Sequence, residues 1–199
     1  IDKIRTKELV NKIGVNVPTE IHPDNLTFPL FAKPRASGSS LAAELCINQT
    51  ELNDLLNRFP SENFIFEKPI AGREFTVGVV QHANTDAALP VIEIISKTGV
   101  FDYQSKYDQN NLAMEICPAE INEDVKIQLQ SIALKVHQYL GVEHMSRSDF
   151  LMNEKCEIYF LEINTIPGIT KTSLIPKMLS AANLDLESLL KAWIKAKLR

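Results

Sequence analysis

Two short strand-like runs in the C-terminal part of the chain, residues 147–152 and 157–164, constrain the fold more than any other feature. Residues 153–156 are all that separates them, and so short a connection joins strands that run antiparallel. Because side chains alternate across a strand, the predicted hairpin has two different faces. One face is mostly apolar and is expected to pack on a core: Ser148, Phe150, Met152, Tyr159, Leu161 and Ile163.

The other face of this hairpin gathers oxygen and charge chemistry, with Arg147 and Asp149 on the first strand and Glu162 and Asn164 on the second. A turn centred on residues 154–155 places Arg147 across from Glu162 and Asp149 diagonally from it. Carboxylate and amide oxygens suit Mg²⁺, and one glutamate can bridge two ions. A solvated face with a cross-strand ion pair worth ~0.2–1 kcal/mol is an equal alternative. Spacing alone leaves both interpretations open.

The rest of the chain alternates helical and strand-like periodicity, which predicts an α+β fold. The expected helices cover residues 2–12, 50–58, 122–141 and 184–198. The expected strands cover residues 26–33, 64–67, 74–81 and 90–95, with a turn region at 18–25 and an irregular loop at 102–116. The helix within 122–141 shows apolar residues at helical spacing between a cap, Asn122, and a stop, Gly141.

Composition narrows the classes of protein to consider. No apolar run approaches the roughly 20 residues of a membrane span, and no secretory pattern opens the chain, which favours a cytoplasmic location. Three cysteines without a C-x-x-C pair favour free thiols over disulfides or zinc. A net charge of -4, with basic residues scattered among acidic ones, disfavours nucleic acid and anionic membranes as partners.

The segments FLEINTIPG (160–168) and TSLIP (172–176) closely resemble the C-terminal signature of the D-alanine:D-alanine ligases, which are ATP-grasp enzymes. Further segments match that family in the same order along nearly all 199 residues: DK (2–3), KP (33–34), GSS (38–40), EK (67–68), GREFTV (72–77), KY (106–107) and CPA (117–119). The resemblance implies an ATP-grasp fold, in which two α+β subdomains hold the nucleotide between them. We expect these subdomains at residues 1–69 and 70–199.

The reaction that the resemblance implies is ATP-dependent ligation of two D-alanines through an acyl phosphate, for peptidoglycan synthesis. The implied ATP-binding residues are Lys3, Lys33, Ser40, Glu67, Lys68, Ile70, Glu74 and Lys106. Among them, Glu67 and Lys68 match the family's hinge that meets the adenine, and Glu74 matches the carboxylate that accepts the ribose hydroxyls. Those implied to bind two Mg²⁺ ions, for which Mn²⁺ can substitute, are Asp149, Glu162 and Asn164.

The implied catalytic residues are Arg147, Gly168, Ser39 and Tyr107. In the family the arginine and the glycine N–H stabilise the tetrahedral centre, and the tyrosine accompanies D-alanine as second substrate. Ser173 and Leu174 match the residues that bind the carboxylate of that second D-alanine. From the sequence itself, residues 172–173 also read as the N-cap of the next helix.

The chain departs from the family at two places. Residues 41–43 read LAA instead of Val-Gly-Val, and His144-Met145 replace a glycine and an aromatic residue, with His144 interpreted as structural or merely exposed. Full-length relatives carry a further N-terminal domain and are usually homodimers, so the chain is expected to be truncated and inactive alone. Two alternatives stay open: another ATP-grasp ligase, such as a D-alanine:D-lactate ligase, or a non-catalytic ATP-binding fragment.

Overall fold

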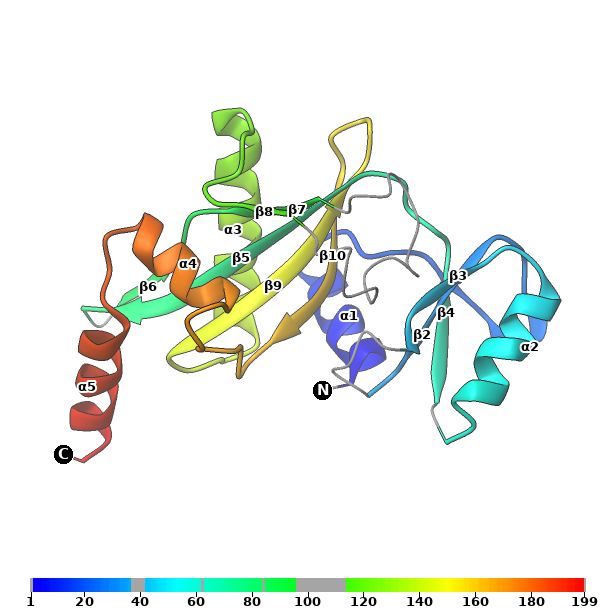
Figure 1. The fold of residues 1–199 in the computed structure, drawn as a ribbon, viewed down its shortest axis with the longest axis horizontal. Coiled ribbons are helices and arrows are strands. Elements are labelled where there is room, and N and C mark those ends of the chain that lie inside the picture. Colours follow the sequence, from blue (N-terminus) through cyan, green and yellow to red (C-terminus); the bar gives the residue numbers. More distant parts are fainter. Residues whose placement is uncertain (1, 37–41, 62, 84, 96–113, 199) are drawn as a thin grey trace. The chain divides into compact units, whose positions relative to one another are not determined.

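The structure is a computed structural model that describes residues 2–36, 42–61, 63–83, 85–95 and 114–198 (Figure 1). The chain divides into two compact units. The first unit comprises Ile1–Gly72, Ser96–Met114 and Leu151–Glu162. The second unit comprises Arg73–Ile95, Glu115–Phe150 and Ile163–Arg199. Our division of the chain into subdomains at residues 1–69 and 70–199 stays a prediction.

The first unit is built on a four-stranded sheet. Its strand order is β1 (Glu20–Ile21), β4 (Phe64–Glu67), β2 (Leu30–Pro34) and β3 (Glu44–Cys46). Each of these neighbouring pairs is antiparallel. The prediction of β4 is confirmed at both ends, whereas β2 begins four residues later than predicted, at Leu30 rather than Leu26.

Two α-helices and a short 3₁₀ helix, Pro23–Asn25, also lie in the described part of this unit. Helix α1 (Lys3–Lys12) begins where the side chain of Asp2 accepts the N–H of Arg5 at 3.2 Å, and Gly14 follows its end with a φ of 76°. Helix α2 (Gln49–Arg58) buries its apolar stripe against the sheet. The core consists of Ile21, Leu30, Ala32, Cys46, Leu52, Leu55 and Phe66.

The larger sheet has the strand order β10 (Ile158–Asn164), β9 (Met145–Met152), β5 (Arg73–His82), β7 (Ile92–Ile95) and β8 (Met114–Ile116). Strand β6 (Thr85–Ala88) pairs with β5. The predicted hairpin is therefore present as β9 and β10. The prediction of an irregular loop through residue 116 is wrong at its end, because residues 114–116 form β8.

Strand β5 is buried without interruption from Phe75 to Val80, which requires cover on both faces of the sheet. Helix α3 (Glu123–Tyr139) lies on one side, and α4 (Leu174–Ala181) and α5 (Leu186–Lys197) lie on the other (Figure 1). The core under α4 and α5 consists of Val80, Leu89, Ile92, Ile175, Met178, Leu179, Leu189 and Trp193. None of the helices in the described ranges could cross a lipid bilayer.

Helix α3 confirms the predicted cap and stop. Asn122 accepts the N–H of Val125 at 2.8 Å, and Gly141 takes a φ of 63° just beyond the helix. The buried stripe differs by one step from the predicted one, since Ala133 and His137 are buried in place of Ile132 and Leu140. The buried positions shift around the helix because an α-helix has 3.6 residues per turn, so no whole number of residues completes a single turn.

His137 is the one titratable side chain in this stripe. Its Nδ1 lies 2.7 Å from the hydroxyl of Ser146 on β9, and its Nε2 lies 3.8 Å from the carboxylate of Asp86 on β6. Burial lowers the pKa of His137, and the nearby charge of Asp86 opposes that shift. The folded protein therefore favours the neutral imidazole.

We expect this histidine to make the stability of the folded protein depend on pH. A lowered pKa in the folded state gives a stabilisation that is complete above the unfolded pKa of about 6.5 and is lost as the pH falls below it. The melting temperature should thus drop between pH 7 and pH 5, and the drop should be smaller in His137→Asn. His22→Asn, a change at an exposed histidine, should keep the full drop in a differential scanning fluorimetry series.

The two strands of the hairpin differ in how well the predicted faces hold. On β9 the predicted inward residues Ser148, Phe150 and Met152 are buried, and the residues between them are half-buried. On β10 the prediction is partly wrong, because Phe160 on the opposite face is fully buried while Tyr159 is half-buried. The N–H of Phe160 donates to the carbonyl of Asn16 at 2.8 Å, so the segment after α1 lies along the edge of β10 that β9 does not occupy.

The cysteines behave as predicted. Cys46, Cys117 and Cys156 are free thiols, and Cys46 is buried in the core of the first unit. Burial raises the pKa of Cys46 to about 11, which keeps it protonated and unreactive at neutral pH.

Candidate active site

Three of the predicted nucleotide-binding residues are buried charged side chains of the first unit, each in an ion pair. Lys33, on β2, places its ammonium 2.9 Å from the carboxylate of Glu67, on β4. Lys3, on α1, lies 3.5 Å from the carboxylate of Glu162, on β10. Lys3, Lys33 and Glu67 are buried, which is unusual for charged side chains without partners or ligands.

Sequence reasoning missed a further buried lysine, Lys7, which lies beside Glu67. It lies one helical turn after Lys3 on α1, and it also binds the carboxylate of Glu67. Burial and the charge of Lys33 together lower the pKa of Lys7 to about 7, against the opposing effect of Glu67. The i, i+4 spacing of Lys3 and Lys7 on one helix face was the available signal.

The predicted adenine hinge begins at Glu67, the last residue of β4. Lys68 donates its backbone N–H to the carbonyl of Thr19 at 2.9 Å and keeps its side chain exposed, and Ile70 is half-buried. Gly72 then approaches Met152 so closely that a Cβ atom there would lie 2.7 Å from the Met152 carbonyl carbon. This contact fixes the path of residues 68–72.

In the second unit, Arg147 and Asp149 form a bidentate ion pair along β9. The guanidinium donates to the two carboxylate oxygens at 2.9 and 3.0 Å. The hydroxyl of Thr76, on β5, donates to the same carboxylate at 2.6 Å. Both members are largely buried, so the geometry is held from two strands. The structure thus shows that Arg147 has a partner on its own strand, which the cross-strand pairing expected from the sequence did not anticipate.

The structure brings together Gly168 and Ser173, two residues predicted for the acceptor side of the site. A Cβ atom at Gly168 would lie 2.8 Å from the Ser173 hydroxyl. Ser173 occupies the predicted N-cap position of α4, but its side chain makes no capping bond. Its hydroxyl instead lies 2.8 Å from that of Thr170, so the predicted N-cap position is confirmed, without a capping bond from the side chain. Leu174 packs against the core beneath α4.

The remaining predicted metal ligand, Asn164, ends β10. Its side-chain oxygen accepts the N–H of Ile166 at 3.1 Å. Glu162 and Asn164 are two residues apart on one strand, so their side chains leave the same face of it. Within residues 2–36, 42–61, 63–83, 85–95 and 114–198, no three His, Cys, Asp or Glu side chains gather as a metal site. The predicted set contains two carboxylates and one amide, and an asparagine is not among those four residue types. The absence of such a group therefore does not bear on the predicted set.

Glu74, predicted to accept the ribose hydroxyls, lies near the start of β5 opposite Ile94 of β7. Its neighbour Arg73 makes a bidentate pair with the buried Glu93 at 2.7 and 2.8 Å and stacks over Phe75 at 5.1 Å. These contacts fix the first residues of β5. Four predicted site residues lie outside the described residues: Ser39, Ser40, Lys106 and Tyr107.

His144 and Met145 have a structural explanation. The ring of His144 stacks on Trp193 of α5 at 5.3 Å, and Met145 packs against the same core. The carbonyl of His144 accepts the N–H of Gln81 at 2.7 Å, and Trp193 donates its ring N–H to the carbonyl of Gln81 at 2.8 Å. The structural interpretation of His144 is confirmed, because this network anchors the start of β9, two residues before Arg147.

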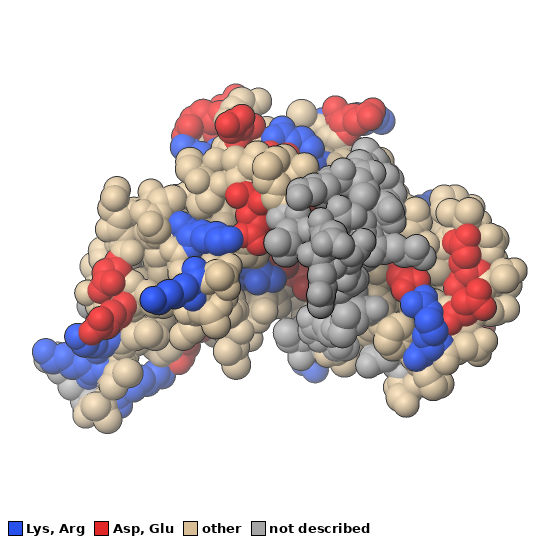
Figure 2. Space-filling view, viewed as in Figure 1, with Lys and Arg blue, Asp and Glu red and all other residues tan. Residues whose placement is uncertain are grey.

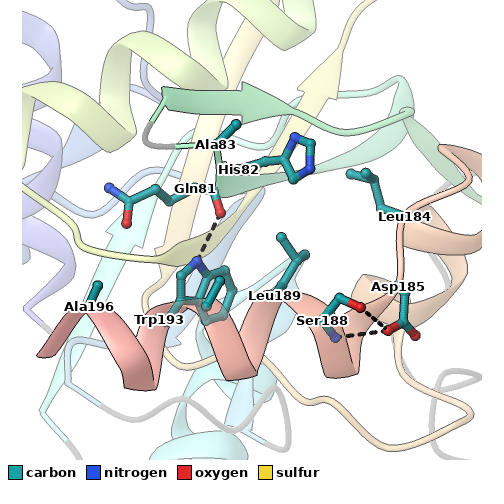
Figure 3. Close-up of a pocket in the computed structure, with 10 residues that line it drawn as sticks. Gln81, His82, Ala83, Leu184, Asp185, Ser188, Leu189, Trp193 and Ala196 are labelled. Carbon is teal, nitrogen blue, oxygen red and sulfur yellow. Dashed lines mark hydrogen bonds between the residues drawn. The ribbon is translucent and has the colours of Figure 1, made fainter. Parts of the chain in front are cut away.

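A cavity of about 280 Å³ lies beside that network, between the end of β5 and α5 (Figure 3). Leu184 and Leu189 contribute apolar lining, and Ser188 and Asp185 bond to each other at the start of α5. The cavity is separate from the predicted site residues, none of which is among those that line it.

On the face of the molecule drawn in Figure 2, basic side chains lie among acidic ones.

Comparison with known proteins places these residues in a family. The family model described as "D-ala D-ala ligase C-terminus" matches residues 7–195. The chain belongs to this family. It is 35% identical over 175 residues to the D-alanine–D-alanine ligase of Azobacteroides pseudotrichonymphae, a match that covers 87% of this chain and 54% of that protein.

Solved structures of such ligases confirm the fold. The VanG D-Ala:D-Ser ligase of Enterococcus faecalis superposes with a TM-score of 0.80 at 30% identity, over 98% of this chain and 60% of that one. The Bacillus anthracis D-alanine–D-alanine ligase complexed with ATP superposes with a TM-score of 0.77 at 25% identity, over 100% and 66%. The predicted ATP-grasp fold is therefore confirmed, and the chain spans between half and two thirds of the length of these relatives.

Proposed function

We propose that the chain is the nucleotide- and metal-binding part of an ATP-dependent D-alanine–D-alanine ligase of peptidoglycan synthesis. The observation that carries the proposal is the fixed geometry of Arg147, which Asp149 holds by two hydrogen bonds while Thr76 orients Asp149. A rigid cation next to an oxygen-rich strand end suits a reaction that develops negative charge on oxygen.

In the first unit, the buried lysines supply positive charge for a nucleotide. Lys3 and Lys33 would contact the phosphates, and Lys68, Ile70 and, from the second unit, Glu74 would meet the adenosine. Ser40 and Lys106 complete this proposed set. The lysines suit the task because a phosphate can replace water around a buried ammonium, whose desolvation is otherwise costly.

The metal donors fit a hard cation. Asp149 Oδ2 accepts from Arg147 and, as a carboxylate oxygen, has a second lone pair for a ligand, and the side-chain oxygen of Asn164 likewise has one beyond its bond to Ile166. With Glu162, they would hold two Mg²⁺ or Mn²⁺ ions. Bound there, such ions would neutralise charge on the phosphate oxygens.

The chemistry then proceeds on the bound substrates. The carboxylate of the first D-alanine attacks the γ-phosphorus of ATP, which gives an acyl phosphate and ADP. The amine of the second D-alanine attacks that acyl carbon, and inorganic phosphate leaves. Arg147 and the N–H of Gly168 would stabilise the tetrahedral oxyanion, with Ser39 and Tyr107 completing the catalytic set.

The acceptor is held, in this proposal, at the start of α4. Ser173 and Leu174 would bind the carboxylate of the second D-alanine, since the Ser173 hydroxyl is directed to residues 168–170 instead of to the helix. The N-terminal end of a helix adds a favourable field for an anion. The D-Ala:D-Ser ligase among the structural relatives favours D-serine as the alternative acceptor.

The test measures phosphate release and dipeptide formation with magnesium, ATP and D-alanine. The chain is assayed alone and joined to the part of a relative that it does not match, with Glu162→Gln as the inactive control. We expect D-alanyl-D-alanine from the joined, unmutated protein. Product with D-serine or D-lactate in preference to D-alanine would overturn the acceptor assignment, and ATP binding without any product would favour a non-catalytic module.

Two further parts of the proposal concern context. A ligase that uses ATP and makes peptidoglycan precursors belongs in the cytoplasm, where the nucleotide is. The joined protein is expected to form a homodimer, which size-exclusion chromatography with light scattering would show.

A further inference from the structure

The buried cluster around Glu67 contains more positive charge than the mechanism uses. Two ammonium groups, those of Lys7 and Lys33, bind the one carboxylate of Glu67. The side chains of Lys7 and Lys33 are each 9% exposed and that of Glu67 is 4% exposed. When both lysines are protonated, the three groups carry a net charge of +1 in a place that water barely reaches.

Such an excess is costly, and it can be relieved in two ways. One lysine can lose its proton, or an anion can bind beside the cluster. The groups that face Lys7 act on its proton in opposite directions. Glu67, from β4, favours the protonated form, and Lys33, from β2, disfavours it. Lys3, the neighbouring lysine of α1, has its own carboxylate partner in Glu162.

We infer that Lys7 is a positioning residue of the proposed nucleotide site, which holds Glu67 and Lys33 in place and gains a proton when the nucleotide binds. The inference rests on the proposed function, because Lys33 is the residue through which the nucleotide charge would reach Lys7. Lys7 itself contacts the carboxylate of Glu67 and acts through it.

The expected consequence is a nucleotide affinity that weakens as the pH rises. Burial and Lys33 lower the pKa of Lys7 to about 7, so above neutral pH much of the unliganded protein lacks this proton. Binding of Mg-ATP then takes up part of a proton. Uptake of a whole proton would raise the Kd about tenfold per pH unit, and we expect about threefold between pH 7 and pH 8.

Three variants separate this role from simple packing. Lys7→Met keeps the length of the side chain and leaves Glu67 paired with Lys33, so it should fold with an unchanged or higher melting temperature. Lys7→Arg keeps a permanent positive charge, so it should regain the affinity for Mg-ATP that Lys7→Met loses, and it should bind without proton uptake. Lys12→Met, at an exposed lysine of the same helix, is the matched control.

The experiment is calorimetric titration of the 199-residue chain with Mg-ATP, in phosphate and in Tris buffer, from pH 7.0 to pH 8.5. The unmodified chain and Lys12→Met should show heats that differ between the buffers, and the two Lys7 variants should show equal heats. Proton uptake that persists in both Lys7 variants overturns the inference, as does a Kd of the unmodified chain that is independent of pH. Failure of the unmodified chain to bind Mg-ATP overturns the nucleotide site itself.

Discussion

Replacing Arg147 with methionine is expected to lower kcat of the joined enzyme by about 10²–10³-fold, the usual cost of losing one oxyanion donor. The affinity for Mg-ATP should change by less than about threefold, because the arginine acts on charge that develops in the transition state. Lysine at this position keeps the charge but not the bidentate geometry with Asp149. It should therefore recover a part of the rate and no more.

Steady-state phosphate release, with melting temperatures recorded beside it, measures this effect. Arg58→Met is the matched control, since Arg58 also binds a carboxylate, that of Glu44 at 2.6 Å, but lies on α2 and is not one of the predicted site residues. The control should keep its kcat. A folded Arg147→Met enzyme with normal kcat would remove Arg147 from the catalytic set.

The elements predicted well are those whose ends have local causes. Helix α3 has its cap at Asn122 and its stop at Gly141, and both signals act within one helical turn. The hairpin was predictable because residues 153–156 leave no room for any other connection. Polar residues concentrated on one strand face then pointed to chemistry.

The elements missed depend on partners far along the chain. Strand β1 consists of Glu20 and Ile21 and is held by pairing with β4, some 45 residues later. Strand β3 likewise exists through its pairing with β2. A stretch of two or three residues carries no periodicity of its own, so sequence patterns could not reveal it.

The candidate site shows the same division. Lys33 and Glu67 were assigned from the resemblance, and the structure adds that they bind each other. Lys7 was not predicted as a site residue because a lysine on a helix normally faces solvent. Whether it is buried depends on which strands the helix packs against. The family resemblance suggested roles for single residues. The structure adds that two buried lysines, Lys7 and Lys33, share the one carboxylate of Glu67.

Replacing Gly72 with alanine is expected to be the most destabilising single methyl addition among the described glycines. The added Cβ would collide with the backbone carbonyl of Met152 and lie 3.0 Å from the Cα of Asn153, and neither backbone atom can rotate away. Overpacking costs about 1–3 kcal/mol, occasionally more, and a rigid contact belongs at the upper end of that range. The loss exceeds the stabilisation of roughly 0.4–1 kcal/mol that alanine brings by restricting the unfolded chain.

Gly78→Ala provides the matched comparison. Its Cβ would lie 2.8–3.0 Å from the ends of the Ile175, Met178 and Leu89 side chains, which can rotate, so the loss should be smaller. Thermal unfolding should show a fall of about 6–12 °C for Gly72→Ala and less for Gly78→Ala. Because Gly72 fixes the path of residues 68–72, its variant should also bind Mg-ATP more weakly, while Gly78→Ala should not. Equal melting temperatures for the two variants would show that the chain around Gly72 can move aside, and that the hinge is not held by this contact.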